Sequence, residues 1–123
     1  MANLGYVGLG AMGSQMADRL MAKGHTVIGY NRTKSKAQWL LDKGMTWGAT
    51  PRDVARGADV IFVMVTDSAA LEGVADGPDG LVAGLSAGKT IIDMSTVSPV
   101  VSRETVEKVR ACGADMVDSP VSG

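Results

Sequence analysis

The sequence has few of the residues that build disulfide frameworks, metal centres and membrane spans. Cys112 is its one cysteine, so no internal disulfide can form, and this fits a reducing compartment. His25 is its one histidine and lies far from Cys112 in the sequence, which gives no support for a metal site. No apolar run approaches the ~20 residues that a transmembrane helix needs. We therefore expect no metal centre and no membrane association.

Targeting signals and a strong net charge are also absent. The N-terminal apolar run is not preceded by the basic segment of a secretory signal, so we expect a cytoplasmic protein. The formal net charge of -1 gives no general reason to expect a nucleic-acid partner. The charge is unevenly spread, because residues 1–60 carry eight Lys and Arg against four acids, whereas residues 61–123 carry four against nine. At 123 residues the chain is long enough for one domain with a real core.

Glycine, in contrast, is abundant, and three of the 16 glycines lie at G-x-G-x-x-G spacing within Leu4 to Leu20. Gly8 permits a tight turn, Gly10 lets a pyrophosphate approach the backbone, and Gly13 lets a helix pack closely on the preceding strand. Such spacings also arise by chance in a glycine-rich chain, and a purely structural turn is the alternative. Here the motif joins an apolar strand to a helix of 3.6-residue periodicity, expected from Ala11 to Lys23, whose N-terminus would face the phosphates. We therefore predict a dinucleotide phosphate site formed by Gly8, Leu9, Gly10, Ala11, Met12 and Gly13.

The end of the second expected strand, Thr26 to Tyr30, indicates which dinucleotide binds. In dinucleotide-binding folds an acid at this place accepts hydrogen bonds from the adenosine ribose 2′-hydroxyl. This sequence has Asn31, Arg32 and Thr33 instead, which are donors that suit a 2′-phosphate. The triplet favours NADP over NAD. The alternative is that Arg32, with the nearby lysines, only begins a solvated basic helix.

Strands and helices alternate along the whole chain, which predicts an α/β fold. Further strands are expected at residues 45–47, 60–65, 90–94 and 114–118, and helices at about 35–43, 51–57, from 68 onwards, at 81–85 and from 99 to about 113. This alternation indicates a doubly wound parallel sheet, a Rossmann fold, with strand order 3-2-1-4-5-6 and a single domain over 1–123. Ligands bind at the carboxyl ends of such strands, so Val65 and Thr66 should lie near the cofactor. Asp67 could be a catalytic acid, but a helix cap formed by Asp67 or Ser68 is the better interpretation.

Three motifs together resemble a known enzyme family. They are the glycine turn at 8–13, the segment Asp93-Met94-Ser95-Thr96-Val97-Ser98-Pro99, and the ending Asp118-Ser119-Pro120-Val121-Ser122-Gly123. In this combination and order they resemble the β-hydroxyacid dehydrogenases, which include 3-hydroxyisobutyrate dehydrogenase and tartronate semialdehyde reductase. The related 6-phosphogluconate dehydrogenases and imine reductases share the glycine turn, but the ending looks less like theirs.

The resemblance implies roles for particular residues. The three glycines would hold the pyrophosphate, Val65 and Thr66 would border the adenosine, and Thr96 would lie by the nicotinamide ribose. Ser122 and Gly123 look like the start of the family's substrate-anchoring turn. The triplet at 31–33 is similar to that of members that use NADP. The resemblance also implies a small hydroxy acid or semialdehyde as substrate.

One departure from the family limits what this piece is expected to do. In the family, a lysine on a helix beyond the anchoring turn exchanges the proton at the substrate oxygen, and general acid catalysis of this kind is worth about 10² to 10⁴ in rate. None of the six lysines here follows Ser122, so the chain should contain no catalytic residue. The helical second domain that usually forms the dimer would also be missing. We expect cofactor binding without turnover, and the alternative is a non-catalytic nucleotide-binding or interaction module.

Overall fold

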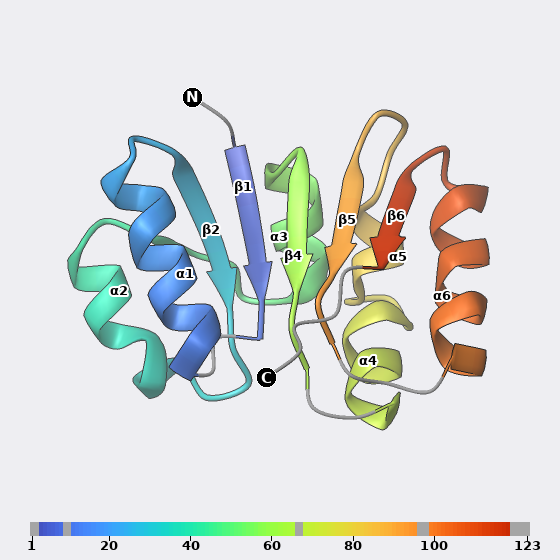
Figure 1. Cartoon of the computed structure of the whole chain (residues 1–123), viewed down its shortest axis with the longest axis horizontal. Coiled ribbons are helices and arrows are strands. Elements are labelled where there is room, and N and C mark those ends of the chain that lie inside the picture. Colours follow the sequence, from blue (N-terminus) through green and yellow to red (C-terminus); the bar gives the residue numbers. More distant parts are fainter. Residues whose placement is uncertain (1–2, 9–10, 66–67, 96–98, 119–123) are drawn as a thin grey trace.

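A computed structural model describes residues 3–8, 11–65, 68–95 and 99–118 of the chain. Within these residues the strands form one parallel sheet with the order β3-β2-β1-β4-β5-β6 (Figure 1). The predicted doubly wound sheet and its strand order are confirmed. The strands are β1 (Asn3–Val7), β2 (Thr26–Tyr30), β3 (Thr46–Trp47), β4 (Val60–Val63), β5 (Thr90–Asp93) and β6 (Asp115–Asp118).

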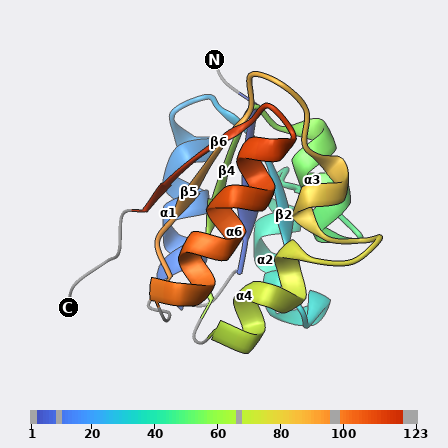
Figure 2. The same ribbon diagram turned by 90° about the vertical axis from the view of Figure 1, so that its right-hand side faces the viewer.

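Helices connect the strands on both sides of the sheet. They are α1 (Ala11–Ala22), the 3-10 helix η1 (Lys34–Ala37), α2 (Gln38–Asp42), α3 (Pro51–Gly57), α4 (Ser68–Ala75), α5 (Leu81–Gly84) and α6 (Pro99–Ala111). Figure 2, seen from the β6 edge, shows α1 on one side of the sheet and α3 on the other. None of these helices combines the length and the apolarity that crossing a membrane would require.

The core is divided by the sheet into two apolar clusters. On one face, α3, α4, α5 and α6 pack on the sheet through Val54, Leu71, Leu81 and Val109, each no more than 1% exposed. On the other face, α1, η1 and α2 contribute Ala17, Ala37 and Leu40, which are fully buried. The central strands β1 and β4 are covered on both faces, which explains their near-continuous apolar sequence.

Several predicted helix boundaries are found where the sequence placed them. Thr50 caps α3, because its Oγ1 accepts a hydrogen bond from the Asp53 backbone N–H at 3.2 Å, and Pro51 takes the first helical position. Gly24 and Gly44 follow α1 and α2 with φ of +93° and +109°, the left-handed conformation that ends a helix.

The helical segment between β2 and β3 differs in detail from the one expected. The helix expected at 35–43 begins as the 3-10 helix η1 and becomes α-helical only at Gln38; the residue before η1, Thr33, makes no side-chain capping bond. On α6, the Lys108 amino group lies 2.9 Å from Oδ1 of Asp76 on α4. The hydrogen bond to Asp76 raises the pKa of Lys108, and the charge of Glu104 acts in the same direction less strongly.

Candidate functional site

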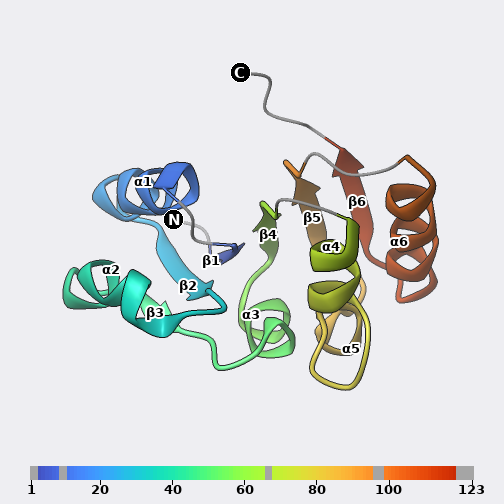
Figure 3. The same ribbon diagram turned by 90° about the horizontal axis from the view of Figure 1, so that it is seen from below.

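The reversal of strand order places the candidate site at the carboxyl ends of β1, β2 and β4. Strand β1 pairs with β2 on one side and β4 on the other, with Val7 opposite both Tyr30 and Val63. From β1 the connections lead outward to β2 and β3, and from β4 they lead in the other direction (Figure 3). A crevice forms outside the strand ends at such a switch point, and ligands of doubly wound sheets bind there.

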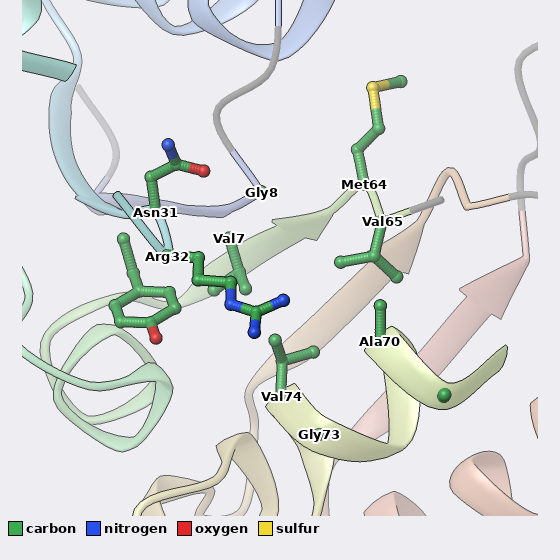
Figure 4. A pocket seen from close by; sticks show the side chains of 11 residues that line it. Val7, Gly8, Asn31, Arg32, Met64, Val65, Ala70, Gly73 and Val74 are labelled. Atoms are coloured by element: carbon green, nitrogen blue, oxygen red, sulfur yellow. The ribbon is translucent and has the colours of Figure 1, made fainter. Parts of the chain in front are cut away.

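A cleft of about 690 Å³ occupies this position. Its base is the ends of β1 and β4, one wall is the end of β2, and the opposite wall is α4 (Figure 4). The lining residues are Val7, Gly8, Tyr30, Asn31, Arg32, Met64, Val65, Ala69, Ala70, Gly73 and Val74. Most of the lining is apolar or small, and the polar groups are gathered at the β2 wall. The sequence therefore folds so that Gly8, Asn31, Arg32 and Val65, all predicted to contact the cofactor, share one concave surface.

Gly8 begins the turn after β1 in a conformation that only glycine adopts readily. Its φ is +97°, and its backbone N–H donates to the Tyr30 carbonyl at 3.1 Å. A Cβ at this position would collide with the backbone carbonyl of Met64. Gly8 therefore lets the turn pass close to the end of β4, so that the ends of β1, β2 and β4 meet at the cleft.

Gly13, in the first turn of α1, has the packing role expected of it. A Cβ there would lie 2.7 Å from the Gly8 carbonyl oxygen and 3.0 Å from Cε1 of Tyr6. Tyr6 is fully buried, stacks on Phe62 with ring centroids 5.6 Å apart, and donates its hydroxyl to Sδ of Met16 at 3.4 Å. The missing side chain thus lets α1 lie directly on β1 and on the turn that begins at Gly8.

The polar wall of the cleft comes from the residues after β2. Asn31 donates from Nδ2 to the Thr33 carbonyl at 3.1 Å, which holds the three residues in a compact bend before η1. Arg32 is exposed, and its guanidinium points into the space between this bend and α4 (Figure 4). Thr33 is exposed and precedes η1, outside the set of residues that line the cleft. The bend offers a cation to an anionic ligand, and the described residues that line the cleft include no carboxylate.

An aromatic stack supports this wall from behind. The ring of Tyr30, which lines the cleft, lies 6.0 Å from the ring of Trp47 on β3. The Lys34 amino group lies 5.7 Å from the centre of the Trp47 ring, within the range of a cation–π interaction. The edge strand β3, only two residues long, therefore contributes to the site by holding Tyr30 in place.

The end of β4 is fastened to the end of β5 by side-chain hydrogen bonds. The Ser95 hydroxyl accepts from the Val65 backbone N–H at 2.9 Å. The Ser95 N–H in turn donates to Oδ1 of Asp93 at 2.9 Å. Asp93 is fully buried and Ser95 is 3% exposed, so these bonds are shielded from water.

Sequence reasoning missed a large part of the cleft. Tyr30 and the α4 residues Ala69, Ala70, Gly73 and Val74 line it, yet none of them was singled out. Small residues on a helix give no chemical signal in the sequence. The one available signal was position, because α4 closely follows Val65 and Thr66, which were predicted to lie near the cofactor.

Several predicted site residues lie outside the described part of the chain. They are Leu9, Gly10, Thr66, Thr96, Ser122 and Gly123; Ala11 and Met12 begin α1, but their side chains are not described. Asp67, one of the two residues expected to cap α4, also lies outside the described part, whereas Ser68, the other, is the first residue of α4. Within the described ranges, no group of three or more His, Cys, Asp or Glu residues could hold a metal ion.

A comparison with protein families gives one match that covers nearly the whole chain. Residues 3–123 match the family described as the NAD binding domain of 6-phosphogluconate dehydrogenase. The match includes the glycine turn, the strand ends that form the cleft, and the ending that was outside the structural description.

Known relatives include both an enzyme and a nuclear protein. The chain is 40% identical over 124 residues to 2-hydroxy-3-oxopropionate reductase of Escherichia coli, a match that covers 98% of this chain and 41% of that protein. It is 37% identical to the cytokine-like nuclear factor N-PAC of Xenopus tropicalis, covering 98% of this chain and 22% of that one. The chain thus spans less than half the length of these curated relatives.

A solved structure has the same fold and contains a dinucleotide. Psf3, in complex with NADP+ and 2-OPP, superimposes with a TM-score of 0.90 at 33% identity, over 98% of this chain and 43% of that one. These matches confirm the resemblance to the hydroxyacid dehydrogenases and related reductases that the sequence indicated.

Proposed function

Because the chain belongs to the family of NAD-binding domains of 6-phosphogluconate dehydrogenase, we propose that it binds NADP in the cleft between β2, β4 and α4. The observation that carries the proposal is the position of Arg32 at a cleft that begins at the Gly8 turn. The phosphates would lie at Gly8 and the N-terminus of α1, where backbone N–H groups and the helix dipole favour an anion.

The preference for NADP over NAD follows from the charge at the β2 wall. A 2′-phosphate carries negative charge that a guanidinium matches both in charge and in geometry. The lining residues at this wall offer Arg32 and the amide of Asn31, with no acid to repel a phosphate or to accept from a 2′-hydroxyl. The NADP+ in the related Psf3 structure supports the same choice.

We further propose that the domain serves an oxidoreductase that moves a hydride between the nicotinamide and a small 3-hydroxy acid or semialdehyde. The relationship to 2-hydroxy-3-oxopropionate reductase supports this substrate class. Bound cofactor would supply the hydride, while this chain's residues bind and orient it. Thr96, Ser122 and Gly123 would contact the nicotinamide ribose and the substrate. The 123 residues alone should bind cofactor without turnover, since the proton donor would come from the rest of the enzyme.

A binding measurement tests the cofactor choice. Calorimetric titration of the purified chain with NADPH and with NADH should give clearly tighter binding of NADPH. Absence of binding to either dinucleotide would overturn the proposed function, and a preference for NADH would overturn the role of the β2 wall alone.

The substitution Arg32→Asp tests the residue behind the preference. It should raise the Kd for NADPH by about 10- to 100-fold, which corresponds to the free energy of one charge-assisted hydrogen bond. The Kd for NADH should change much less. Arg103→Asp is the matched control, because Arg103 is an exposed residue of α6 that does not line the cleft. Equal effects of Arg32→Asp on both dinucleotides would favour the solvated role of Arg32.

The catalytic part of the proposal needs a longer protein. This domain joined to the helical second domain of a hydroxyacid dehydrogenase should reduce glyoxylate or succinic semialdehyde with NADPH. The second candidate function, a nucleotide-binding or interaction module without chemistry, is favoured by the relationship to the nuclear factor N-PAC. Tight NADPH binding with no turnover of either aldehyde by the joined protein would favour that module.

A further inference from the structure

We propose that Ser95 is a positioning residue that sets the shape of the cleft at Val65; the inference rests on the proposed cofactor function. Val65 lies two residues beyond the end of β4 and lines the cleft, whereas Ser95 follows β5 and is not among the lining residues. Ser95 would therefore act on the site through Val65.

The regular pairing of β4 with β5 ends just before this point. The last backbone bond between the two segments runs from the Met94 N–H to the Val63 carbonyl at 2.8 Å. The next donor on the β4 side, the Val65 N–H, binds the Ser95 hydroxyl at 2.9 Å in place of a backbone carbonyl. A side chain thus replaces the main chain as the acceptor, and the two backbones can separate without leaving the Val65 N–H unpaired.

Asp93 directs the serine toward β4. Its Oδ1 accepts the backbone N–H of Ser95, two residues later, at 2.9 Å, which is the pattern of an Asx turn. The turn bends the chain immediately after β5, and the Ser95 hydroxyl also approaches the Val63 carbonyl at 3.5 Å. Ser95 thereby joins the carboxyl end of β5 to the end of β4, which forms the base of the cleft together with the end of β1.

This hydrogen bond links the segment after β4 to the segment after β5, and the sequence predicts cofactor contacts in both. Thr66 follows Val65 in the chain and Thr96 follows Ser95, and both were predicted to contact the dinucleotide. Because the Ser95 hydroxyl accepts from the Val65 N–H, it fixes the distance between these two segments. Losing that acceptor frees the Val65 N–H to turn toward water, which widens the range of positions that the cleft edge can take.

Substitution of Ser95 tests the proposal. Ser95→Ala should raise the Kd for NADPH by about 5- to 10-fold at a temperature where the protein is fully folded, and Ser95→Thr, which retains the hydroxyl, should restore most of the affinity. Thr105→Ala is the matched control, because it removes another buried hydroxyl, on α6, from a residue that does not line the cleft. It should leave the Kd unchanged even if it lowers the melting temperature.

Amide hydrogen exchange gives a readout that needs no cofactor. In Ser95→Ala the Val65 amide should exchange at least about tenfold faster, whereas the Met64 amide, which donates to the Val7 carbonyl at 2.9 Å, should keep its protection. If wild-type protein binds NADPH and Ser95→Ala binds it equally well, with unchanged exchange at Val65, the positioning role is overturned while the proposed function stands. If wild-type protein does not bind NADPH, the proposed function fails.

Discussion

Gly8 and Met64 lie so close together that a single Cβ on Gly8 would overlap the backbone carbonyl of Met64. The two residues belong to segments that follow β1 and β4, the adjacent strands at which the sheet order reverses. Their close approach brings the glycine turn beside the end of β4 and so determines the shape of the cleft between them. The glycine therefore serves the packing of the sheet as well as the proposed binding of phosphate.

Gly8→Ala should lower the free energy of unfolding by about 2 to 5 kcal/mol, since it adds a steric overlap to the cost of a left-handed backbone. Gly44→Ala separates the two effects, because Gly44 also has a positive φ, +109°, but has no atom within 4 Å of an added Cβ. It should cost only about 1 to 2 kcal/mol. Urea unfolding of the three proteins measures the difference, and equal losses would show that the overlap at Met64 is relieved.

Gly84 and Gly73 provide a second matched pair. A Cβ on Gly84, the last residue of α5, would collide with the Arg52 carbonyl of α3 and approach the Ala55 Cβ at 3.0 Å. A Cβ on Gly73 of α4 would meet nothing within 4 Å. Gly84→Ala should destabilise the protein by about 1 to 3 kcal/mol, whereas Gly73→Ala should stabilise it by up to about 1 kcal/mol through helix propensity. Thermal unfolding should therefore shift in opposite directions for the two variants.

Tyr6 should make stability depend on pH in the alkaline range. Burial raises the pKa of Tyr6 from 10.0 to about 12, so the folded protein holds the phenol proton more tightly than the unfolded chain does. The resulting stability is fully present below pH 10 and is lost between pH 10 and about 12, where only the unfolded chain ionises. The total loss approaches about 2 to 3 kcal/mol.

Urea unfolding over this pH range should show the decline in wild-type protein and a smaller one in Tyr6→Phe. The chain has two tyrosines, so Tyr30→Phe leaves Tyr6 as the only phenol in the molecule. An absorbance titration of Tyr30→Phe then reads the ionisation of Tyr6 directly. A midpoint near 10 in the folded protein would contradict the effect of burial.

Lys89 should stabilise the junction between α3 and the start of β4. Its amino group donates to the carbonyls of Arg56 at 3.1 Å and Ala58 at 2.6 Å, which lie at the C-terminal end of α3, the negative end of the helix dipole. Lys89→Met should cost about 1.5 to 3 kcal/mol because two carbonyls lose a charged donor. Lys36→Met, at an exposed position on η1, is the control and should change the melting temperature little.

The strand order was predictable because its signals are local and agree with one another. The helix expected at 51–57 is α3, and the strand expected from residue 60 is β4. The end of that strand was less predictable. Six apolar residues predicted a strand to Val65, but β4 ends at Val63, because the Val65 N–H binds a serine side chain 30 residues away instead of a strand partner. Sequence periodicity carries no information about such a contact.

The candidate site was predictable where chemistry leaves a residue signature. Glycine spacing and a missing acid indicated Gly8 and Arg32, and both line the cleft. The wall formed by Ala70 and Gly73 had no such signature, since its contribution is the space left by small side chains. Ser95 was recognised only as part of a family motif, because its contact with Val65 requires knowledge of the sheet.

The stack of Tyr30 on Trp47 gives the cleft an optical reporter of its own. Tyr30 touches both the cleft and the indole, so a dinucleotide that displaces the Tyr30 ring alters the surroundings of Trp47. The chain has one other tryptophan, Trp39, which is 40% exposed on α2 and lies under the Lys43 amino group. Trp39→Phe therefore leaves Trp47, beside the site, as the single tryptophan, and quenching of its fluorescence can follow ligand entry without any label.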